Sequence, residues 1–157
     1  MKKSFLFLLL FFSAMLSACS DVTLTDASED AAHRRLIGER YEVIGVVDAY
    51  GIRRHSKADV EYITLVPRPG FKGPEVGFKV RVDPGSVVRI DRVVKTNRWF
   101  DCRVAFIVSL QGMALPEDET IRIEMNRGNE GSGCLELNPE LYRSLRDPIA
   151  DHSGENA

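Results

Sequence analysis

The sequence has few of the residues on which catalytic and metal sites are usually built. Its 157 residues include three histidines, three cysteines and one tryptophan. The histidines (His33, His55 and His152) are far apart, no C-x-x-C pair occurs, and no glycine-rich phosphate-binding loop is present. These absences argue against a zinc site, a dithiol redox site and a nucleotide site, so we expect no metal and no cofactor.

The sequence also lacks a strong excess of charge of one sign. It has 21 lysines and arginines against 23 aspartates and glutamates. A nucleic-acid-binding domain is usually clearly basic, so we expect no nucleic-acid partner. The charge is uneven, however, because residues 79–103 carry seven basic and three acidic residues. This segment either pairs with the acidic C-terminal part or forms a basic face for an anionic partner.

No apolar run is long enough to span a membrane. The longest extends from Phe5 to Leu16, about twelve residues, whereas a spanning helix needs about 20. It follows Lys2 and Lys3 and ends at Leu16-Ser17-Ala18-Cys19. A positive end, a short apolar stretch and small residues before a possible cleavage point are typical of a signal peptide.

The segment Leu16-Ser17-Ala18-Cys19 resembles the lipobox of bacterial lipoproteins. The resemblance implies that residues 1–18 are removed and that Cys19 carries a diacylglyceryl group and an N-linked acyl chain such as palmitate. Membrane lipid would then be a permanent partner. Ser20 implies that the protein is sorted to the outer membrane, facing the periplasm. Asp21 leaves the inner membrane as a less expected location, and the cell surface is another. An ordinary signal cleaved after Ala18 is the alternative.

The two remaining cysteines, Cys102 and Cys134, form an even pair in an exported domain, and we predict a disulfide between them. It would close a loop of about 32 residues, which stabilises a domain by roughly 3 to 4 kcal/mol in the chain-entropy account. A metal pair and a redox site are the alternatives, but no histidine is close to either cysteine in the sequence.

Short runs of alternating apolar and polar residues, separated by proline and glycine, predict an all-β domain. We expect a small antiparallel barrel or sandwich of about six strands, at residues 41–48, 60–66, 76–82, 87–95, 99–110 and 121–126. Short flanking helices are predicted at residues 27–37 and after Asn138-Pro139. The predicted organisation is a signal peptide (1–18), a lipidated tether (19–26), a β-rich domain (27–149) and a disordered tail (150–157).

Candidate binding residues lie on one loop and in the basic segment. Phe71 is at the centre of the proline-rich loop 67–74, where it either faces a partner or folds inward. The basic segment contributes Lys79, Arg81 and Arg89, and Trp99 is either an interface anchor or a core residue. The family resemblance does not extend to any of these residues.

The leading functional hypothesis is a non-enzymatic, membrane-anchored binding or accessory module for an envelope protein or glycan. An inhibitor or immunity protein against an envelope-targeting enzyme belongs to the same class. The alternative is a small hydrolase of peptidoglycan or another glycan, with Asp48, Asp59 or Glu61 as acid and base. A weaker possibility is a binder of anionic lipid or lipopolysaccharide through the basic face.

Overall fold

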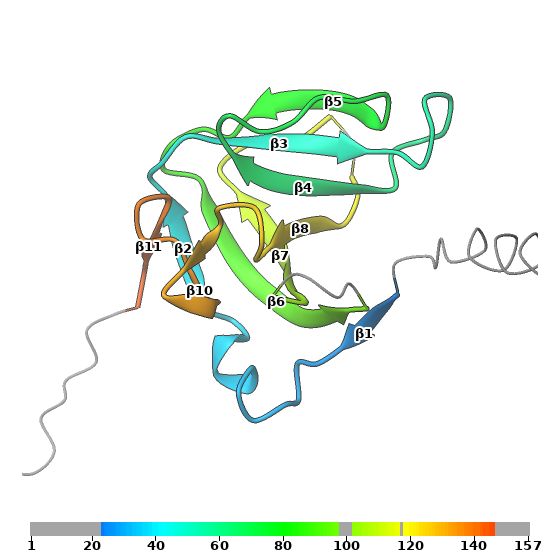
Figure 1. The fold of residues 1–157 in the computed structure, drawn as a ribbon. Coiled ribbons are helices and arrows are strands. Elements are labelled where there is room, and N and C mark those ends of the chain that lie inside the picture. Colours follow the sequence, from blue (N-terminus) through cyan, green and yellow to red (C-terminus); the bar gives the residue numbers. More distant parts are fainter. Residues whose placement is uncertain (1–22, 98–101, 117, 147–157) are drawn as a thin grey trace, which may run out of the picture.

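The computed structural model describes residues 23–97, 102–116 and 118–146, and strands dominate this part of the chain. In order they are β1 (Leu24–Asp26), β2 (Arg40–Val43), β3 (Val47–Ile52), β4 (Tyr62–Pro67), β5 (Val76–Arg81), β6 (Val87–Thr96), β7 (Val104–Gln111), β8 (Ile121–Glu124), β9 (Glu130–Gly131), β10 (Gly133–Leu137) and β11 (Tyr142–Ser144). The one helical element in these ranges is a 3₁₀ turn, η1 (Arg34–Leu36). The predicted all-β class is confirmed (Figure 1).

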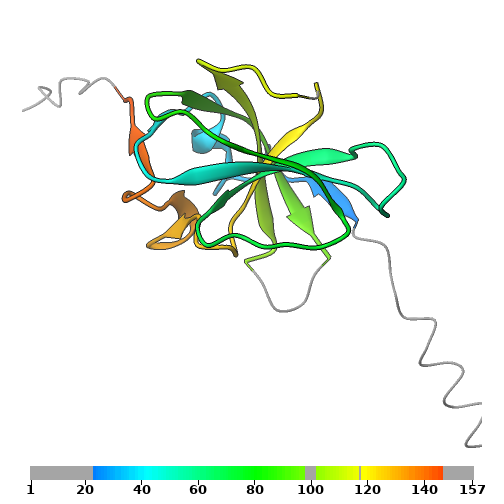
Figure 2. The ribbon, with the colours of Figure 1, turned by 90° about the horizontal axis from the view of Figure 1, so that it is seen from above.

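Nine of the strands form a single sheet that folds over on itself. Its order is β11-β2-β6-β7-β8-β4-β3-β5, with β1 added to the end of β6, and β9 and β10 form a separate pair. All neighbours are antiparallel except β4 and β8, which are parallel, so the predicted antiparallel topology holds with one exception. Figure 1 shows β3, β4 and β5 lying above β6 and β7, and from above β3 crosses the yellow-green strands beneath it at a large angle (Figure 2).

The sheet bends where a predicted strand is broken. Residues 41–48 are predicted to be one strand, but β2 and β3 are separate elements on either side of residues 44–46. A Cβ at Gly45 would lie 2.6 Å from a side-chain carbon of Leu141, so only glycine fits this contact. Val43 N donates to Ser86 O at 2.8 Å, so the β2–β6 pairing continues up to the bend, where Ile44 N and Gly45 N donate to Leu141 O instead.

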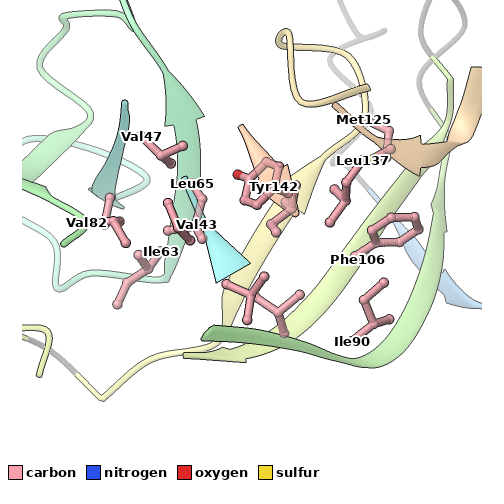
Figure 3. Packing of buried hydrophobic residues seen from close by; sticks show 14 of the residues in the cluster. Val43, Val47, Ile63, Leu65, Val82, Ile90, Phe106, Met125, Leu137 and Tyr142 are labelled. Carbon is pink, nitrogen blue, oxygen red and sulfur yellow. The ribbon is translucent and has the colours of Figure 1, made fainter. Parts of the chain in front are cut away.

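The main core lies inside the fold and follows the predicted alternation. In β4, Ile63 and Leu65 face this core and are fully buried. Figure 3 shows the packing of these and neighbouring side chains. On the other side of β4, Val66 packs in a second cluster with Tyr50 and the partly buried Phe71. Both faces of β3 and β4 are therefore covered, which holds these strands rigidly.

The helix predicted at residues 27–37 is wrong. Asp26 ends β1 instead of capping a helix, and Ala27 N donates to Val93 O at 2.9 Å. His33 is buried and hydrogen-bonds Ala27 O through Nδ1 at 3.0 Å, while Leu36 reaches the core. Hydrogen bonds to β6 fix this segment as successive turns, and β1 occupies the last three residues of the expected tether.

The helix predicted after Asn138-Pro139 is also wrong. One turn does begin there, because Tyr142 N donates to Asn138 O at 2.9 Å. The chain then pairs with β2 as β11, and the buried Tyr142 hydroxyl donates to Asn129 Oδ1 at 3.0 Å. Burial raises the pKa of Tyr142, which stays neutral. Strand pairing and this buried contact prevail over the local helical signal.

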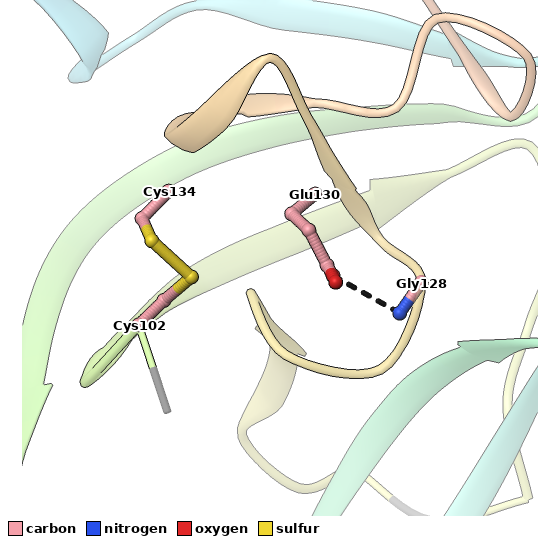
Figure 4. The surroundings of a disulfide bond; sticks show 4 residues. All are labelled: Cys102, Gly128, Glu130 and Cys134. Carbon is pink, nitrogen blue, oxygen red and sulfur yellow. Dashed lines mark hydrogen bonds between the residues drawn. A yellow bond between two sulfur atoms is a disulfide. The ribbon is translucent and has the colours of Figure 1, made fainter. Parts of the chain in front are cut away.

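The predicted disulfide between Cys102 and Cys134 is present (Figure 4). It links the segment just before β7 to strand β10, with 5.4 Å between the two Cα atoms. Nearby, Gly128 N donates to Glu130 Oε2 at 3.0 Å. None of the helical segments within the described ranges is long and apolar enough to cross a bilayer.

Candidate functional site

A groove of about 450 Å³ opens at the end of the molecule where β3 ends, β4 begins and β1 lies beside β6. Its lining brings together residues that are far apart in sequence, from the β3–β4 loop, the start of β7 and the outer face of β8. The charged side chains in the lining are Arg53, Arg54, Glu61, Arg103, Arg122 and Glu124. Four arginines face two glutamates here, so the groove carries an excess of positive charge.

The β8 wall follows from strand alternation. Ile123 and Met125 point into the core, so Arg122, Glu124 and Asn126 lie on the outer face. The guanidinium carbon of Arg122 lies 3.9 Å from the centre of the Tyr62 ring. Such a cation–π contact fixes the plane of the guanidinium group and leaves its edge available for hydrogen bonds.

The opposite wall is held by Arg53. Its two terminal nitrogens donate to Ser56 O and Gly77 O, each at 2.9 Å. A Cβ at Gly77 would come within 2.6 Å of Arg53 Nε, so the side chain lies against backbone that only glycine leaves open. Arg53 is therefore fixed by carbonyl oxygens, which do not neutralise its charge.

The two glutamates are already engaged. Glu61 pairs with Arg54 at 3.1 Å, and Glu124 pairs at 2.9 Å with Arg127, which is not part of the lining. Within the described ranges neither Arg53 nor Arg122 has a carboxylate within ion-pair distance. Burial lowers the pKa of Arg122, since partial removal from water disfavours the charged form.

Eight buried polar side-chain atoms have no hydrogen-bond partner among the described residues, and three of them belong to residues of this lining. These three are Nε of Arg53, Nε of Arg122 and Oδ1 of Asn126. A buried polar atom without a partner costs about 1 to 3 kcal/mol, so native proteins rarely leave one unexplained. Two donors and one acceptor are thus carried by residues of one groove, and a bound anion with a neighbouring hydroxyl would satisfy them if these side chains turn toward it.

Arg103 completes the lining from the start of β7. Its φ of 56° makes it the one non-glycine residue with positive φ in the described chain. Arg103 O accepts a hydrogen bond from Thr96 N at 2.8 Å, and the preceding residue is the disulfide-bonded Cys102. Left-handed backbone at a residue with a long side chain is unfavourable, and such strain is concentrated at functional sites.

Two of the binding residues predicted from the sequence, Phe71 and Lys79, lie elsewhere, around Asp48 and Tyr50. The Phe71 ring stacks on the Tyr50 ring with 4.7 Å between centroids, which is the inward alternative. Lys79 Nζ and Arg68 Nε contact Oδ2 of the buried Asp48 at 3.0 and 3.2 Å. Burial alone would raise the pKa of Asp48, but these two hydrogen bonds outweigh it and hold the pKa below its ordinary value.

The other predicted residues do not join this cluster in one exposed face. Arg81 lies opposite Asp48 in the β3–β5 register, whereas Arg89 lies on β6 between Arg40 and Ser109 and pairs with Asp91 at 2.8 Å. Trp99 lies outside the described residues, as does Cys19. The groove is lined instead by four arginines that are not among the predicted binding residues: Arg53, Arg54, Arg103 and Arg122.

A signal for the groove was nevertheless present in the sequence. The polar face of residues 121–126 and the basic loop after Tyr50 supply Arg122 and Arg53, but strand alternation does not say which distant loop covers which face. The acids proposed for catalysis do not converge, because Asp48 is ion-paired, Asp59 is exposed in the β3–β4 loop and Glu61 pairs with Arg54. Over the described ranges no three histidine, cysteine or acidic side chains are grouped as metal ligands.

Comparison with known proteins gives no match to a family model, to a curated protein or to a solved structure.

Proposed function

We propose that this protein is a lipid-anchored, non-enzymatic binding module of the bacterial envelope, and that its arginine-lined groove takes an anionic envelope component. The observation that carries the proposal is the meeting of four arginines in one groove in which both glutamates are paired with arginines. Arginine is the side chain best suited to carboxylate and phosphate groups, because its planar donors match their oxygens. The proposed anchor rests on the lipobox that ends at Cys19.

The alternative of a small hydrolase has less support from the geometry. A glycosidase needs two carboxyl groups that flank the scissile bond, one of them with a raised pKa. Asp48 has a lowered pKa and two cationic partners, and Glu61 is held by Arg54. An inhibitor or immunity protein would use the same groove to bind an acidic surface of its target and is contained in the proposal.

The anchor is tested by mass spectrometry of the protein purified from cell membranes. We expect a chain that begins at Cys19 and carries the mass of diacylglycerol plus one acyl chain. The Cys19→Ala variant is the control and should lack this mass. A chain that retains residues 1–18 without lipid would contradict the proposed anchor.

The groove is tested by photo-crosslinking in intact envelopes. A photoreactive amino acid replaces Thr96, which lines the groove, or Arg89, which lies at the other end of β6. We expect an adduct from position 96 that disappears when Arg122→Gln is added, and none from position 89. Equal adducts from both positions, or an adduct at 96 that is insensitive to Arg122→Gln, would contradict the proposal.

A further inference from the structure

The groove combines charged and apolar lining in a way that indicates the chemistry of its ligand. The unpartnered Nε atoms of Arg53 and Arg122 are donors for a charged oxygen, and Asn126 Oδ1 is an acceptor for a hydroxyl. Leu24 and Ile52 line the same groove. An inorganic anion would satisfy the arginines and leave both the acceptor and the apolar side chains without a use.

The position of the groove in the chain indicates where such a ligand would come from. Leu24 is five residues after Cys19. A fully extended segment of this length spans at most about 18 Å. If Cys19 is acylated, as the proposed function requires, the lipid layer lies within this distance of the groove. Headgroups are then present at a high effective concentration, as for any ligand tethered close to its site.

We infer that the groove binds the headgroup of an anionic phospholipid of the membrane in which the protein is anchored. The phosphodiester oxygens accept from Arg53 and Arg122, and a headgroup hydroxyl donates to Asn126 Oδ1. Leu24 and Ile52 contact the glycerol backbone and the first methylenes of the acyl chains. This binding fixes the orientation of the domain on the membrane. The β1 side faces the lipid, and β11, which Figure 1 shows on the opposite side of the molecule, is directed away.

The test is a titration of the mature acylated protein, which begins at Cys19, in micelles of a neutral detergent. Short-chain phosphatidylglycerol is added and the arginine Nε–H signals are followed by NMR. We expect the Arg53 and Arg122 signals to shift saturably, and short-chain phosphatidylcholine, which is zwitterionic, to bind at least about 10-fold more weakly. Arg122→Gln should weaken phosphatidylglycerol binding by about 10- to 100-fold, the loss of one charge-assisted hydrogen bond.

Arg89→Gln, which removes an arginine distant from the groove, is the matched control and should leave the affinity unchanged. Arg53→Gln is the second variant, should Arg122→Gln fail to give the folded spectrum. Equal binding of the two lipids, or equal losses in the Arg89 and Arg122 variants, would overturn the inference. Glycerol 3-phosphate distinguishes the source of the phosphate, because binding as tight as that of the lipid would make this a site for free phosphate esters.

Failure of the lipid-headgroup inference can be distinguished from failure of the proposed function. The titration reports on the groove whether or not Cys19 is acylated, whereas mass spectrometry reports on the anchor alone. A groove that ignores phosphatidylglycerol but still gives an Arg122-dependent adduct in envelopes would retain the proposed function and remove the lipid headgroup as its ligand.

Discussion

Basic side chains gather at two places in the described part of this protein, and only one of the two surrounds a buried carboxylate. Around Asp48, the cations Arg68 and Lys79 meet a buried carboxylate, and the 67–74 loop closes over it. A Cβ at Gly70 would come within 2.0 Å of the Tyr50 hydroxyl, so the backbone of this loop packs directly on the Tyr50 side chain. In the groove, Arg53 and Arg122 have no carboxylate within ion-pair distance among the described residues. A cluster of cations thus indicates a binding site only where the fold provides neither a carboxylate to pair with the cations nor a loop to cover them.

The largest expected effect comes from the disulfide beside the groove. Replacing Cys102 and Cys134 by serine should lower the free energy of unfolding by about 3 to 4 kcal/mol, because the unfolded chain loses a closed loop of 32 residues. The measurement is chemical denaturation of the variant and of the native protein. The same variant should also affect the groove, because Arg103, which lines it, directly follows Cys102.

The Asp48 cluster should be insensitive to this change. We therefore expect the serine variant to bind the groove's ligand more weakly at temperatures where it is still folded, while the Arg68 and Lys79 contacts persist. Unchanged ligand affinity in the folded double variant would show that the disulfide does not position Arg103.

The second largest effect is expected when the carboxylate is removed from the Asp48 cluster. Asp48→Ala should destabilise the protein by about 2 kcal/mol, because two charge-assisted hydrogen bonds to a buried group are lost. The value is in the lower part of the usual range since Arg68 and Lys79 are half-exposed and become hydrated. Glu61→Ala, which breaks an exposed pair with Arg54, is the control and should change stability by no more than about 0.5 kcal/mol.

The same cluster predicts a dependence of stability on pH. The pKa of Asp48 is lower in the folded protein than its ordinary value of 3.8, so folding favours the ionised form. This stabilisation is complete above about pH 4 and is lost as the pH falls through the folded-state pKa. Denaturation midpoints measured from pH 7 to pH 2 should fall less steeply for Asp48→Asn than for the native protein. Parallel curves would contradict the assignment.

Local patterns predicted the strands well because each strand is read from its own alternation. Residues 60–66 alternate as a strand should, with Ile63 and Leu65 in the main core. In residues 76–82, Val82 lies in the main core, whereas Val76 packs in the second cluster with Tyr50. The two helices failed where a distant partner decided the outcome. Residues 27–37 are held by hydrogen bonds to β6, and Tyr142 is held by β2 and Asn129. No local pattern contains this information.

The candidate site was harder to predict for the same reason. The local excess of basic residues at 79–103, which is the visible charge pattern in the sequence, supplies Arg103 but not the other arginines of the groove. Arg53 and Arg122 are 69 residues apart and meet only because β4, which follows the Arg53 loop, pairs in parallel with β8. A parallel pair between distant strands is the feature that an alternation pattern cannot provide.

The smallest expected effect on stability is the one that separates the two clusters most clearly. Arg122→Met keeps an apolar side chain over Tyr62 and removes a partly buried charge whose Nε has no partner. The lost cation–π attraction and the relieved desolvation cost oppose each other, so we expect a change within about 0.5 kcal/mol, measured by denaturation beside Asp48→Ala. Ligand binding should nevertheless weaken by about 10- to 100-fold, as for Arg122→Gln. Asp48→Ala removes a charge that is paired with two opposite charges, whereas Arg122→Met removes one of several like charges. A loss of stability near 2 kcal/mol for Arg122→Met would therefore mean that the groove, like the Asp48 cluster, stabilises the fold.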